Sequence, residues 1–343
     1  MTLFTAPDFD GHERVIFVTD AATGLRAIVA IHNTSLGPAL GGCRMWSYAH
    51  EADAIADALR LSRAMTYKAA LAGLALGGGK SVILGDPARH KSPELFRAFG
   101  RAVDALGGRY IVAEDVGTTV EDMDAVRTQT SHVGGISAGV GDPSPKTAAG
   151  VLIAMKAAWR HMTGSDCMDG VRVAIQGLGH VGASLARMLS VEGARLVVSD
   201  IDTDRAQSVA VETGATRASP DAIHRADADI FAPCAMGAGL DDATIPELRV
   251  RLVCGAANNQ LAKARHGEAL RARGVVYVPD YLANAGGLIE VARTALGYDA
   301  AEADARRARI ADTVGEILAR AEREGRATSD IADRIAEERF ARA

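Results

Sequence analysis

The alternation of apolar and polar residues along the first part of the chain predicts strands and helices in turn. Short apolar runs bounded by turn residues are typical of strands, and apolar residues recurring every three or four positions are typical of helices. On these patterns we expect a hairpin at residues 13–32, a glycine-rich loop at 37–46, helices at 51–65 and 92–106, strands at 81–87 and 109–119, and a short helix beginning after Thr118 or Thr119. Ser92 is the expected N-cap of the second helix and Pro93 its first residue.

The second part of the chain has the rhythm of a parallel sheet covered by helices. A helix is expected at residues 147–162, then strand, glycine-rich turn, helix and strand over 171–200, then apolar strands at 229–235, 250–259 and 275–287. The glycine, proline and serine density of residues 135–145 is typical of a linker. We therefore expect an α/β fold with an N-terminal α/β domain at 1–140, a Rossmann domain at 141–286, and C-terminal helices at 287–343 that pack back on the first domain.

Composition and charge narrow the class of protein. A chain of 343 residues with 48% hydrophobic residues has material for two cores, and a net charge of -5 argues against an electrostatic nucleic-acid binder. The four cysteines contain no CxxC and the nine histidines no ligand spacing, so no structural metal is expected. No apolar run approaches the roughly 18 residues that span a bilayer, and the N-terminus does not resemble a signal peptide. We expect a cytoplasmic protein without membrane or nucleic-acid partners.

Two lysines frame the segment TYKAALAGLALGGGKS at residues 66–81. Lys68 and Lys80 are separated by small apolar residues and by three consecutive glycines (77–79), which would let the backbone approach a ligand closely. A dry environment and a second cation both favour the neutral form of a lysine amine, and a neutral amine is a base near neutral pH. The alternative is that both lysines are solvated and the glycines form an ordinary turn.

A dinucleotide-binding pattern follows the expected strand that ends at Gln176. Gly177, Gly179 and Gly182 form G-x-G-x-x-G at the start of a helix, where glycines permit a tight turn and the close approach of a pyrophosphate. Asp200 ends the next strand and can accept hydrogen bonds from both ribose hydroxyls, whereas it would repel a 2′-phosphate. We therefore expect NAD rather than NADP as the cofactor.

Amide side chains gather where the later strands are expected to end. Asn258, Asn259 and Asn284 fall at the carboxyl edge of the predicted sheet, which is where α/β proteins bind ligands. Asparagines also stabilise turns, so each of the three has an equally good structural explanation.

Several motifs occur in an order and spacing that identify the chain as similar to one enzyme family. GPALGGCRMW, MTYKAALAGLALGGGKSVI, AEDVGTTVEDMD, DPSPKTAAGV, GLGHVG, DIFAPCAMG, CGAANNQL and PDYLANAGGLI closely resemble the glutamate, leucine, phenylalanine and valine dehydrogenases. The resemblance implies NAD-dependent, reversible oxidative deamination of an L-amino acid to a 2-oxo acid and ammonia. It also implies a homo-oligomer and a site in the cleft between two domains that close on hinges at 135–147 and 284–287.

The motifs carry the family's functional positions onto this sequence. The resemblance implies that Lys80 and Asp115 are catalytic and that Lys68 binds the substrate α-carboxylate; for Asp115 the alternative is a helix cap or an ordinary salt bridge. The other implied substrate positions are Leu40, Gly41, Gly42, Met65, Ala113, Asn258 and Val291. The implied cofactor positions are Thr147, Gly177, Gly179, His180, Val181, Gly182, Asp200, Ala235, Met236, Ala256, Asn258 and Asn284.

The side-chain pocket is expected to be apolar. Glutamate enzymes of the family carry a lysine and a serine where this chain has Leu40 and Val291, so a γ-carboxylate would be buried without a partner. With Met65 and Ala113 these residues predict turnover of leucine, isoleucine and valine, which such pockets separate only weakly. An aromatic substrate is the alternative, and a non-catalytic NAD-responsive interaction protein is an alternative of another class.

Four positions depart from the family pattern. Cys43 replaces a usual threonine, and Lys146 precedes Thr147 where an apolar residue is common. Glu290 and Arg293 flank the pocket residue Val291. If either charged side chain faced the pocket, the substrate would be polar or unusual.

Overall fold

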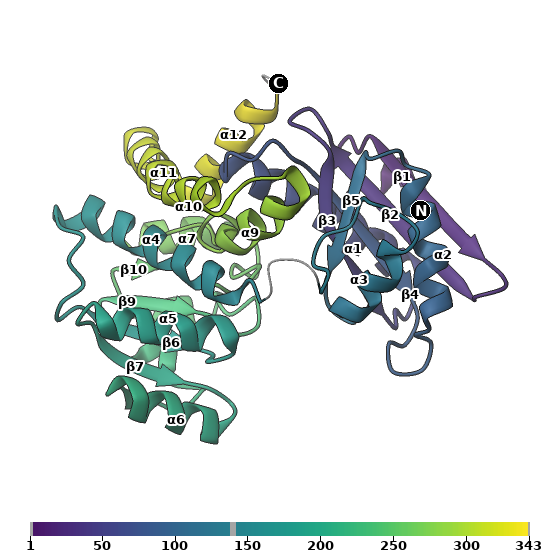
Figure 1. Cartoon of the computed structure of the whole chain (residues 1–343). Coiled ribbons are helices and arrows are strands. Elements are labelled where there is room, and N and C mark those ends of the chain that lie inside the picture. Colours follow the sequence, from purple (N-terminus) through teal and green to yellow (C-terminus); the bar gives the residue numbers. More distant parts are fainter. Residues whose placement is uncertain (1–2, 138–141, 342–343) are drawn as a thin grey trace. The chain divides into compact units, whose positions relative to one another are not determined.

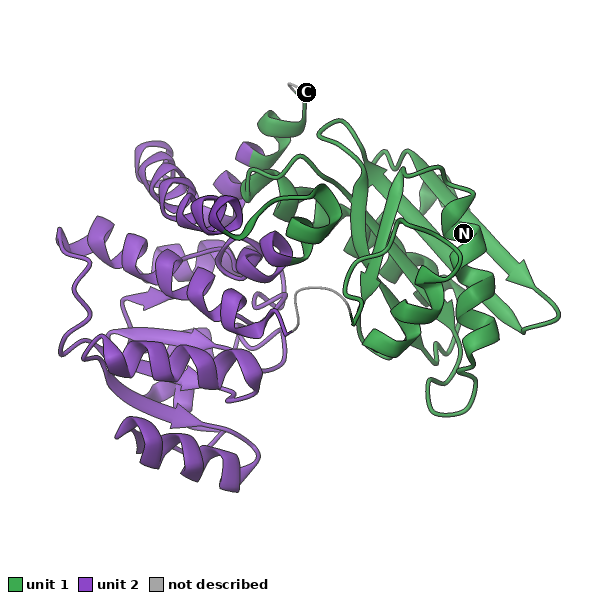
Figure 2. Cartoon of the chain, in the orientation of Figure 1, with its two compact units in different colours: residues 1–141, 291–300, 336–343 green, residues 142–290, 301–335 purple. Residues whose placement is uncertain are grey.

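A computed structural model describes residues 3–137 and 142–341 (Figure 1). Contacts divide the chain into two compact units (Figure 2): unit 1 comprises residues 1–141, 291–300 and 336–343, and unit 2 comprises residues 142–290 and 301–335. The described strands form one five-stranded and one six-stranded sheet, and helices accompany both. The expected α/β class is confirmed.

Unit 1 is built on a mixed sheet with the strand order β1-β2-β4-β3-β5. Its elements up to residue 137 are η1 (Leu3–Thr5), β1 (Arg14–Asp20), β2 (Leu25–Asn33), β3 (Ala39–Trp46), α1 (Glu51–Leu71), β4 (Gly77–Leu84), α2 (Pro93–Asp104), β5 (Tyr110–Glu114) and α3 (Val120–Arg127). β1 and β2 form the predicted hairpin, and β2 pairs antiparallel with β4. β3 runs parallel to both β4 and β5, so it lies inside the sheet.

Local capping explains where the helices of unit 1 begin. The Ser92 hydroxyl accepts a hydrogen bond from the Leu95 N–H, and Pro93 is the first residue of α2, as predicted. Thr119 and Asp122 form a capping box at the start of α3, which confirms the expected start. α1 continues past the predicted end at residue 65 to Leu71, so Lys68 lies in its last turn.

Two glycine-rich segments belong to strands: one within residues 37–46, which the sequence predicts as a loop, and one at 77–79, for which an ordinary turn was the alternative. Residues 39–46 form β3, where a Cβ on Gly41 would lie 1.7 Å from the carbonyl oxygen of Gly79. Gly78 in β4 faces α1, since its Cβ would lie 2.1 Å from the Thr66 nitrogen. A Cβ on Gly79 would lie 2.7 Å from the Tyr110 ring. In the direction of an added Cβ, each of these three glycines makes room for a neighbouring part of the protein.

Helices cover both faces of the unit 1 sheet. One core cluster joins Cys43 and Met45 of β3 to α2 and α3, and a second joins the α1 residues Ala54 and Ala58 to Val82 of β4. Because successive strand residues point to opposite faces, Arg44 and Lys80 lie on the α1 side of the sheet.

Unit 2 contains a parallel sheet with the order β11-β10-β9-β6-β7-β8, typical of a Rossmann fold. Its elements up to residue 284 are α4 (Ser144–Thr163), β6 (Arg172–Gln176), α5 (His180–Val191), β7 (Arg195–Ser199), α6 (Thr203–Thr213), β8 (Thr216–Arg217), η2 (Ile223–Arg225), β9 (Ile230–Pro233), η3 (Ile245–Glu247), β10 (Leu252–Val253), α7 (Arg265–Ala272), β11 (Val276–Tyr277) and α8 (Asp280–Ala283). The predicted strand, turn, helix and strand of 171–200 are present. The last three strands are shorter than predicted.

The C-terminal helices divide between the units. They are α9 (Ala285–Leu296), α10 (Ala300–Ala308), α11 (Ile310–Glu324) and α12 (Thr328–Ala341). Residues 301–335 belong to unit 2, where α11 contacts α4. Within this C-terminal segment, residues 291–300 and 336–343 belong to unit 1. The expected domain boundary at residue 140 falls within 138–141, outside the described residues.

The end of α12 is fixed to unit 1 by specific contacts. Phe340 packs edge-on against the His32 and Tyr67 rings, with centroids 6.3 and 5.6 Å away. The Arg339 guanidinium donates hydrogen bonds to the carbonyl oxygens of Ala70 and Leu71, 3.1 and 2.9 Å away. Both carbonyls lie at the C-terminal end of α1, where Arg339 adds side-chain donors to the backbone.

Candidate active site

A buried lysine and a carboxylate meet on the α1 side of the unit 1 sheet. Lys80, in β4, is only 6% exposed, and its Nζ lies 2.6 Å from Oδ2 of Asp115 at the end of β5. The alternative in which Lys80 is a solvated lysine beside an ordinary turn is therefore excluded. Burial alone would raise the pKa of Asp115, but the Lys80 ammonium and then Arg44 outweigh it and hold this pKa below its usual range.

The turn after β5 fixes the position of Asp115. The Asp115 N–H donates to the Thr118 hydroxyl oxygen, 2.9 Å away, and that hydroxyl contacts the Cys43 carbonyl oxygen at 2.8 Å. Gly117 has φ +81°, and a Cβ there would lie 2.0 Å from the Met45 carbonyl oxygen. A Cβ on Gly42 would lie 2.7 Å from the Asp115 Cβ. Glycine at 42 thus leaves the space that the Asp115 side chain occupies.

Arg44 extends the lysine–aspartate pair into a chain of charges. Its Nε donates to the same Asp115 oxygen at 3.2 Å, and its Nη1 donates to Asp57 of α1 at 2.6 Å. Asp57 also accepts hydrogen bonds from the Tyr48 hydroxyl and the Arg60 guanidinium, 2.6 and 2.8 Å away. Our sequence reasoning assigned no role to Arg44 or Asp57. The available signal was a carboxylate at position 57 within the apolar stripe that contains Ala54 and Ala58.

Lys68 and Met65 lie on α1, where this helix packs against β4. Thr66, two residues before Lys68, contacts Gly78, two residues before Lys80. Lys68 and Met65 are both half-buried. The packing of α1 on β4 therefore brings the segments that carry Lys68 and Lys80 together.

The apolar residues expected to line the pocket fall on adjacent elements of unit 1. Leu40 of β3 pairs with Ile111 of β5, and Gly42 pairs with Ala113. Leu40 and Ala113 are buried, 2% and 7% exposed. A Cβ on Gly134 would lie 3.3 Å from Cγ1 of Val291, which places Val291 beside the end of the β5 region.

Two of the unusual charged positions have partners within unit 2. Glu290 is 7% exposed and its Oε2 lies 3.1 Å from Arg307, with which it forms a buried ion pair. Lys146 Nζ lies 3.6 Å from Asp304. Neither side chain needs a polar substrate to account for its charge.

The glycine-rich turn of unit 2 has the geometry of a nucleotide-binding turn. Gly177 has φ +90°, and its Cβ would lie 2.7 Å from Ala235. A Cβ on Gly182 would lie 2.0 Å from the Gly177 carbonyl oxygen, whereas one on Gly179 would meet nothing within 4 Å. The first and third glycines are thus required by packing, and the second faces open space at the N-terminus of α5. His180 and Val181 begin this helix.

Asp200 lies directly after β7, beside the glycine-rich turn. Its carboxylate accepts hydrogen bonds from the Leu178 and Asp202 N–H groups, 2.6 and 2.8 Å away. Arg205 lies 3.6 Å from Asp200 and 3.1 Å from Asp202. A surface groove of about 740 Å³ runs along this turn, lined by residues of α5 and α6 and by the neighbouring Asp142.

The remaining predicted cofactor residues surround the carboxyl ends of the unit 2 strands. Asn284 is 3% exposed, and its amide nitrogen donates to the Ala256 carbonyl and the Asn258 side chain, 3.1 and 2.9 Å away. Its Oδ1 is buried and has no hydrogen-bond partner among the described residues. Thr147, in the first turn of α4, packs against Gly287, and Met236 is 87% exposed.

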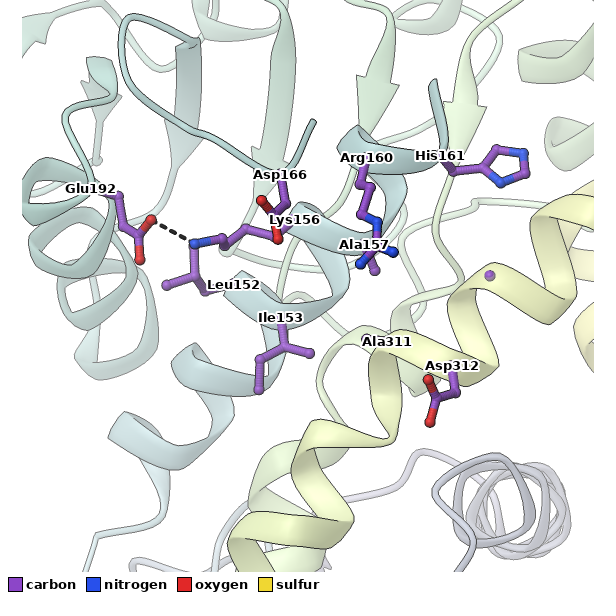
Figure 3. A pocket seen from close by; sticks show the side chains of 11 residues that line it. Leu152, Ile153, Lys156, Ala157, Arg160, His161, Asp166, Glu192, Ala311 and Asp312 are labelled. Carbon is purple, nitrogen blue, oxygen red and sulfur yellow. Dashed lines mark hydrogen bonds and ion pairs between the residues drawn. The ribbon is translucent and has the colours of Figure 1, made fainter. Parts of the chain in front are cut away.

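A larger groove elsewhere in unit 2 carries none of the predicted site residues (Figure 3). It measures about 750 Å³ and is lined by residues of α4 and α11, by Asp166, and by Glu192, which follows α5. Lys156 and Glu192 form an ion pair there, 2.6 Å long. The other lining residues point to no particular chemistry.

Within residues 3–137 and 142–341 we find no helix long and apolar enough to cross a membrane. The same residues contain no group of three or more metal-ligating side chains.

A Rossmann-type sheet with an open glycine-rich turn and a buried lysine–carboxylate pair define a dinucleotide-dependent oxidoreductase. Residues 12–132 match the family model described as Glu/Leu/Phe/Val dehydrogenase, dimerisation domain, and residues 198–326 match Glutamate/Leucine/Phenylalanine/Valine dehydrogenase. The chain therefore belongs to the Glu/Leu/Phe/Val dehydrogenase family, which confirms the resemblance seen in the sequence, and it is an amino-acid dehydrogenase.

Individual relatives agree with this assignment over the whole chain. Leucine dehydrogenase of Bacillus subtilis (strain 168) is 49% identical, covering 100% of this chain and 95% of that enzyme. Valine dehydrogenase of Streptomyces albus is 47% identical with the same coverage. The crystal structure of L-tryptophan dehydrogenase from Nostoc punctiforme superimposes with a TM-score of 0.88 at 43% identity, covering 97% of this chain and 96% of that one.

Proposed function

We propose that this enzyme catalyses the NAD-dependent, reversible oxidative deamination of branched-chain L-amino acids to 2-oxo acids and ammonia. The observation that carries the proposal is the 2.6 Å contact between the buried Lys80 amine and Asp115, flanked by Leu40 and Ala113. A lysine and a carboxylate held together divide acid and base work between them. The similarity to leucine and valine dehydrogenases supports an aliphatic side chain.

The residues of unit 1 account for the proton transfers. Lys68 binds the substrate α-carboxylate, and Asp115 takes a proton from the substrate amine. After the hydride has left Cα, the neutral Lys80 amine removes a proton from the water that attacks the iminium carbon. Asp115 returns its proton to the nitrogen of the carbinolamine. As the C–N bond breaks and ammonia leaves, the Asp115 carboxylate accepts the hydroxyl proton and the carbonyl of the 2-oxo acid forms.

The residues of unit 2 fit NAD. The open space beside Gly179 can admit a pyrophosphate at the N-terminus of α5, and Asp200 can accept hydrogen bonds from the ribose hydroxyls. The orphaned Asn284 Oδ1 is an acceptor for an amide such as the nicotinamide carboxamide. When bound, NAD accepts the hydride from Cα. Thr147, Ala235, Met236, Ala256 and Asn258 complete the proposed contacts.

The apolar pocket selects the substrate. Leu40, Met65, Ala113 and Val291 offer no partner to a charged side chain, so glutamate is a poor substrate. An aromatic substrate is the second candidate, because an L-tryptophan dehydrogenase has a closely similar structure. The small Ala113 is the position that decides how much room a ring would have.

Assembly and location are inferred from the same family. We infer a homo-oligomer that associates through the first unit, since residues 12–132 match a model described as a dimerisation domain. In unit 1, β1 is an edge strand with Phe17 53% exposed, which supports an interface there. The cytoplasmic location expected from the sequence stays a prediction.

The test is NADH formation at alkaline pH from a panel of L-amino acids, with NAD or NADP, by the wild type and by Lys80→Ala. We expect branched-chain, NAD-dependent activity, and a loss of roughly 10²–10⁴-fold in kcat on substitution of the base. Lys91→Ala is the matched control, since Lys91 forms an ion pair with Asp122 outside the proposed site.

Each other result has a definite meaning. Activity only on aromatic amino acids would keep the mechanism and overturn the assignment of the pocket. NAD binding without NADH formation from any amino acid would support the alternative, a non-catalytic NAD-responsive interaction protein. Equal activity of Lys80→Ala and wild type would refute Lys80 as the base.

A further inference from the structure

Arg44 and Lys80 both contact the Asp115 carboxylate. The Arg44 Nε and the Lys80 Nζ contact the same oxygen of Asp115, at 3.2 and 2.6 Å, so the two cationic nitrogens lie within about 6 Å of each other. The Arg44 side chain is 22% exposed and that of Lys80 7%. Their electrostatic coupling is therefore screened less than that of a surface pair.

Asp57 fixes Arg44 in this position. It accepts from Arg44 Nη1 at 2.6 Å, and its side chain is only 11% exposed. The Tyr48 hydroxyl and the Arg60 guanidinium also donate hydrogen bonds to Asp57. Burial alone would raise the pKa of Asp57, but these hydrogen bonds and Arg44 outweigh it, so the pKa is lowered and Asp57 stays charged. The result is an alternating series of charges that begins at Lys80.

We propose that Arg44, held between Asp115 and Asp57, is a positioning residue that keeps the Lys80 amine able to accept a proton. The inference rests on the proposed function, in which Lys80 must be neutral to act as the base. Asp115 on its own would hold the ammonium form of Lys80. Arg44 shares the same carboxylate oxygen and its positive charge opposes that of the ammonium, so the proton leaves Lys80 more easily.

Two buried ionisable groups near the pair, Cys43 and Tyr110, stay neutral in the range of the assay. Burial raises the pKa of the Cys43 thiol to about 12 and the pKa of Tyr110 well above its usual value, so both stay neutral. Lys68 on α1 is a further cation, and it is unchanged in all the variants below. Changes at Arg44 and Asp57 therefore report on the charge series itself.

The proposal predicts shifts of opposite sign in the pH dependence of kcat/KM for oxidative deamination. Arg44→Gln removes the opposing cation, so the midpoint of the acid limb moves to higher pH by about one unit. Asp57→Asn leaves the Arg44 charge less compensated, so the midpoint moves to lower pH by roughly half a unit. Titration of the free substrate contributes equally to every variant and cancels in the comparison.

Two further variants separate charge from structure. Tyr48→Phe removes a neutral donor to Asp57, so the midpoint should stay at the wild-type value. Arg44→Lys keeps the cation and should bring the midpoint back towards the wild type, even if kcat falls because the two-sided fork is lost.

The outcome distinguishes this inference from the proposed function. Opposite shifts of Arg44→Gln and Asp57→Asn, with no shift in Tyr48→Phe, support the role of Arg44. Shifts of the same sign, or lowered activity with unmoved midpoints, overturn it. If Arg44→Gln does not fold, the shift of the Asp57→Asn midpoint to lower pH tests the proposal alone. If Lys80→Ala keeps wild-type activity, the assignment of the base itself fails instead.

Discussion

Gly78→Ala tests whether the packing of α1 on β4 positions the substrate-binding lysine. An alanine Cβ at this position would lie 2.1 Å from the Thr66 nitrogen, 2.2 Å from its hydroxyl oxygen and 2.5 Å from the Ser62 carbonyl oxygen. Two of these three atoms belong to the backbone of α1, so no side-chain rotation relieves the contact. The helix has to move away from β4, and it carries Lys68 with it.

The size of the effect follows from these distances. Ordinary contact between the new Cβ and the Thr66 nitrogen requires the helix to move by more than about 1 Å. Overpacking of this kind costs about 1–3 kcal/mol of folding free energy. A misplacement of about 1 Å at a reacting centre costs on the order of 10²-fold in rate. We therefore expect kcat/KM for the amino acid to fall about 100-fold. Most of the loss should appear as a higher KM for the amino acid, with the KM for NAD little changed.

The assay is steady-state kinetics in both substrates together with urea unfolding. Gly79→Ala is the matched control, because its Cβ would meet the Tyr110 ring at 2.7 Å rather than α1. It should cost comparable stability with a much smaller rise in the KM for the amino acid. A wild-type KM in folded Gly78→Ala, or an equal rise in Gly79→Ala, would refute the link between this contact and Lys68.

Three further predictions follow from the environments of single residues. Gly315→Ala, in the interior of α11 where the new Cβ would meet nothing within 4 Å, should raise the free energy of unfolding by about 0.5–1 kcal/mol in urea titrations. The Lys80 ammonium and Arg44 hold the pKa of Asp115 below its usual value of 3.8, so its carboxylate stabilises the fold above that pH and this contribution is lost as the pH falls further. The difference in unfolding free energy between wild type and Asp115→Asn should therefore narrow below about pH 4, and a constant difference would contradict this. A thiol reagent at mildly alkaline pH should label the exposed Cys167 rapidly in the native protein, because Cys43 and Cys254 are buried and burial raises the pKa of Cys234 to about 11; Cys167→Ser should abolish the fast phase.

Features encoded by contiguous residues could be predicted from the sequence. Ser92 and Thr119 cap their helices because each needs only a partner three residues further on. The turn at Gly177 is equally predictable from the sequence, since strand, glycines and helix follow one another directly. The strand β3 is not predictable from the sequence, because its glycines lower strand propensity and interrupt the apolar pattern. It is a strand because β4 and β5 pair with it on both sides, and that pairing is tertiary.

The same limit explains which site residues were found. The local sequence makes Lys80 a candidate base, but its pairing with Asp115 follows only from the family resemblance, since nothing local in the sequence joins residues 35 positions apart. Once the strands are assigned, the alternation of side chains brings Arg44, Lys80 and Asp115 to one face. The sequence predicts a loop over residues 39–46, and the alternation of side chains assigns a face of the sheet only to strand residues. The face on which Arg44 lies therefore could not be predicted. Asp57 was passed over because a buried carboxylate is recognisable only when its cationic partner is known.

The position of these groups on strands has a consequence for how the enzyme can be tuned. Arg44 and Lys80 project from neighbouring strands in the interior of the sheet, and Asp115 follows the last residue of a third. Backbone ladders fix the spacing of such groups more rigidly than loops do. A change in the charge of one member therefore alters the proton affinity of the others before it alters their positions. This predicts that substitutions that remove a charge from this series, such as Asp57→Asn, change the pH dependence of the reaction more readily than its rate at the optimum.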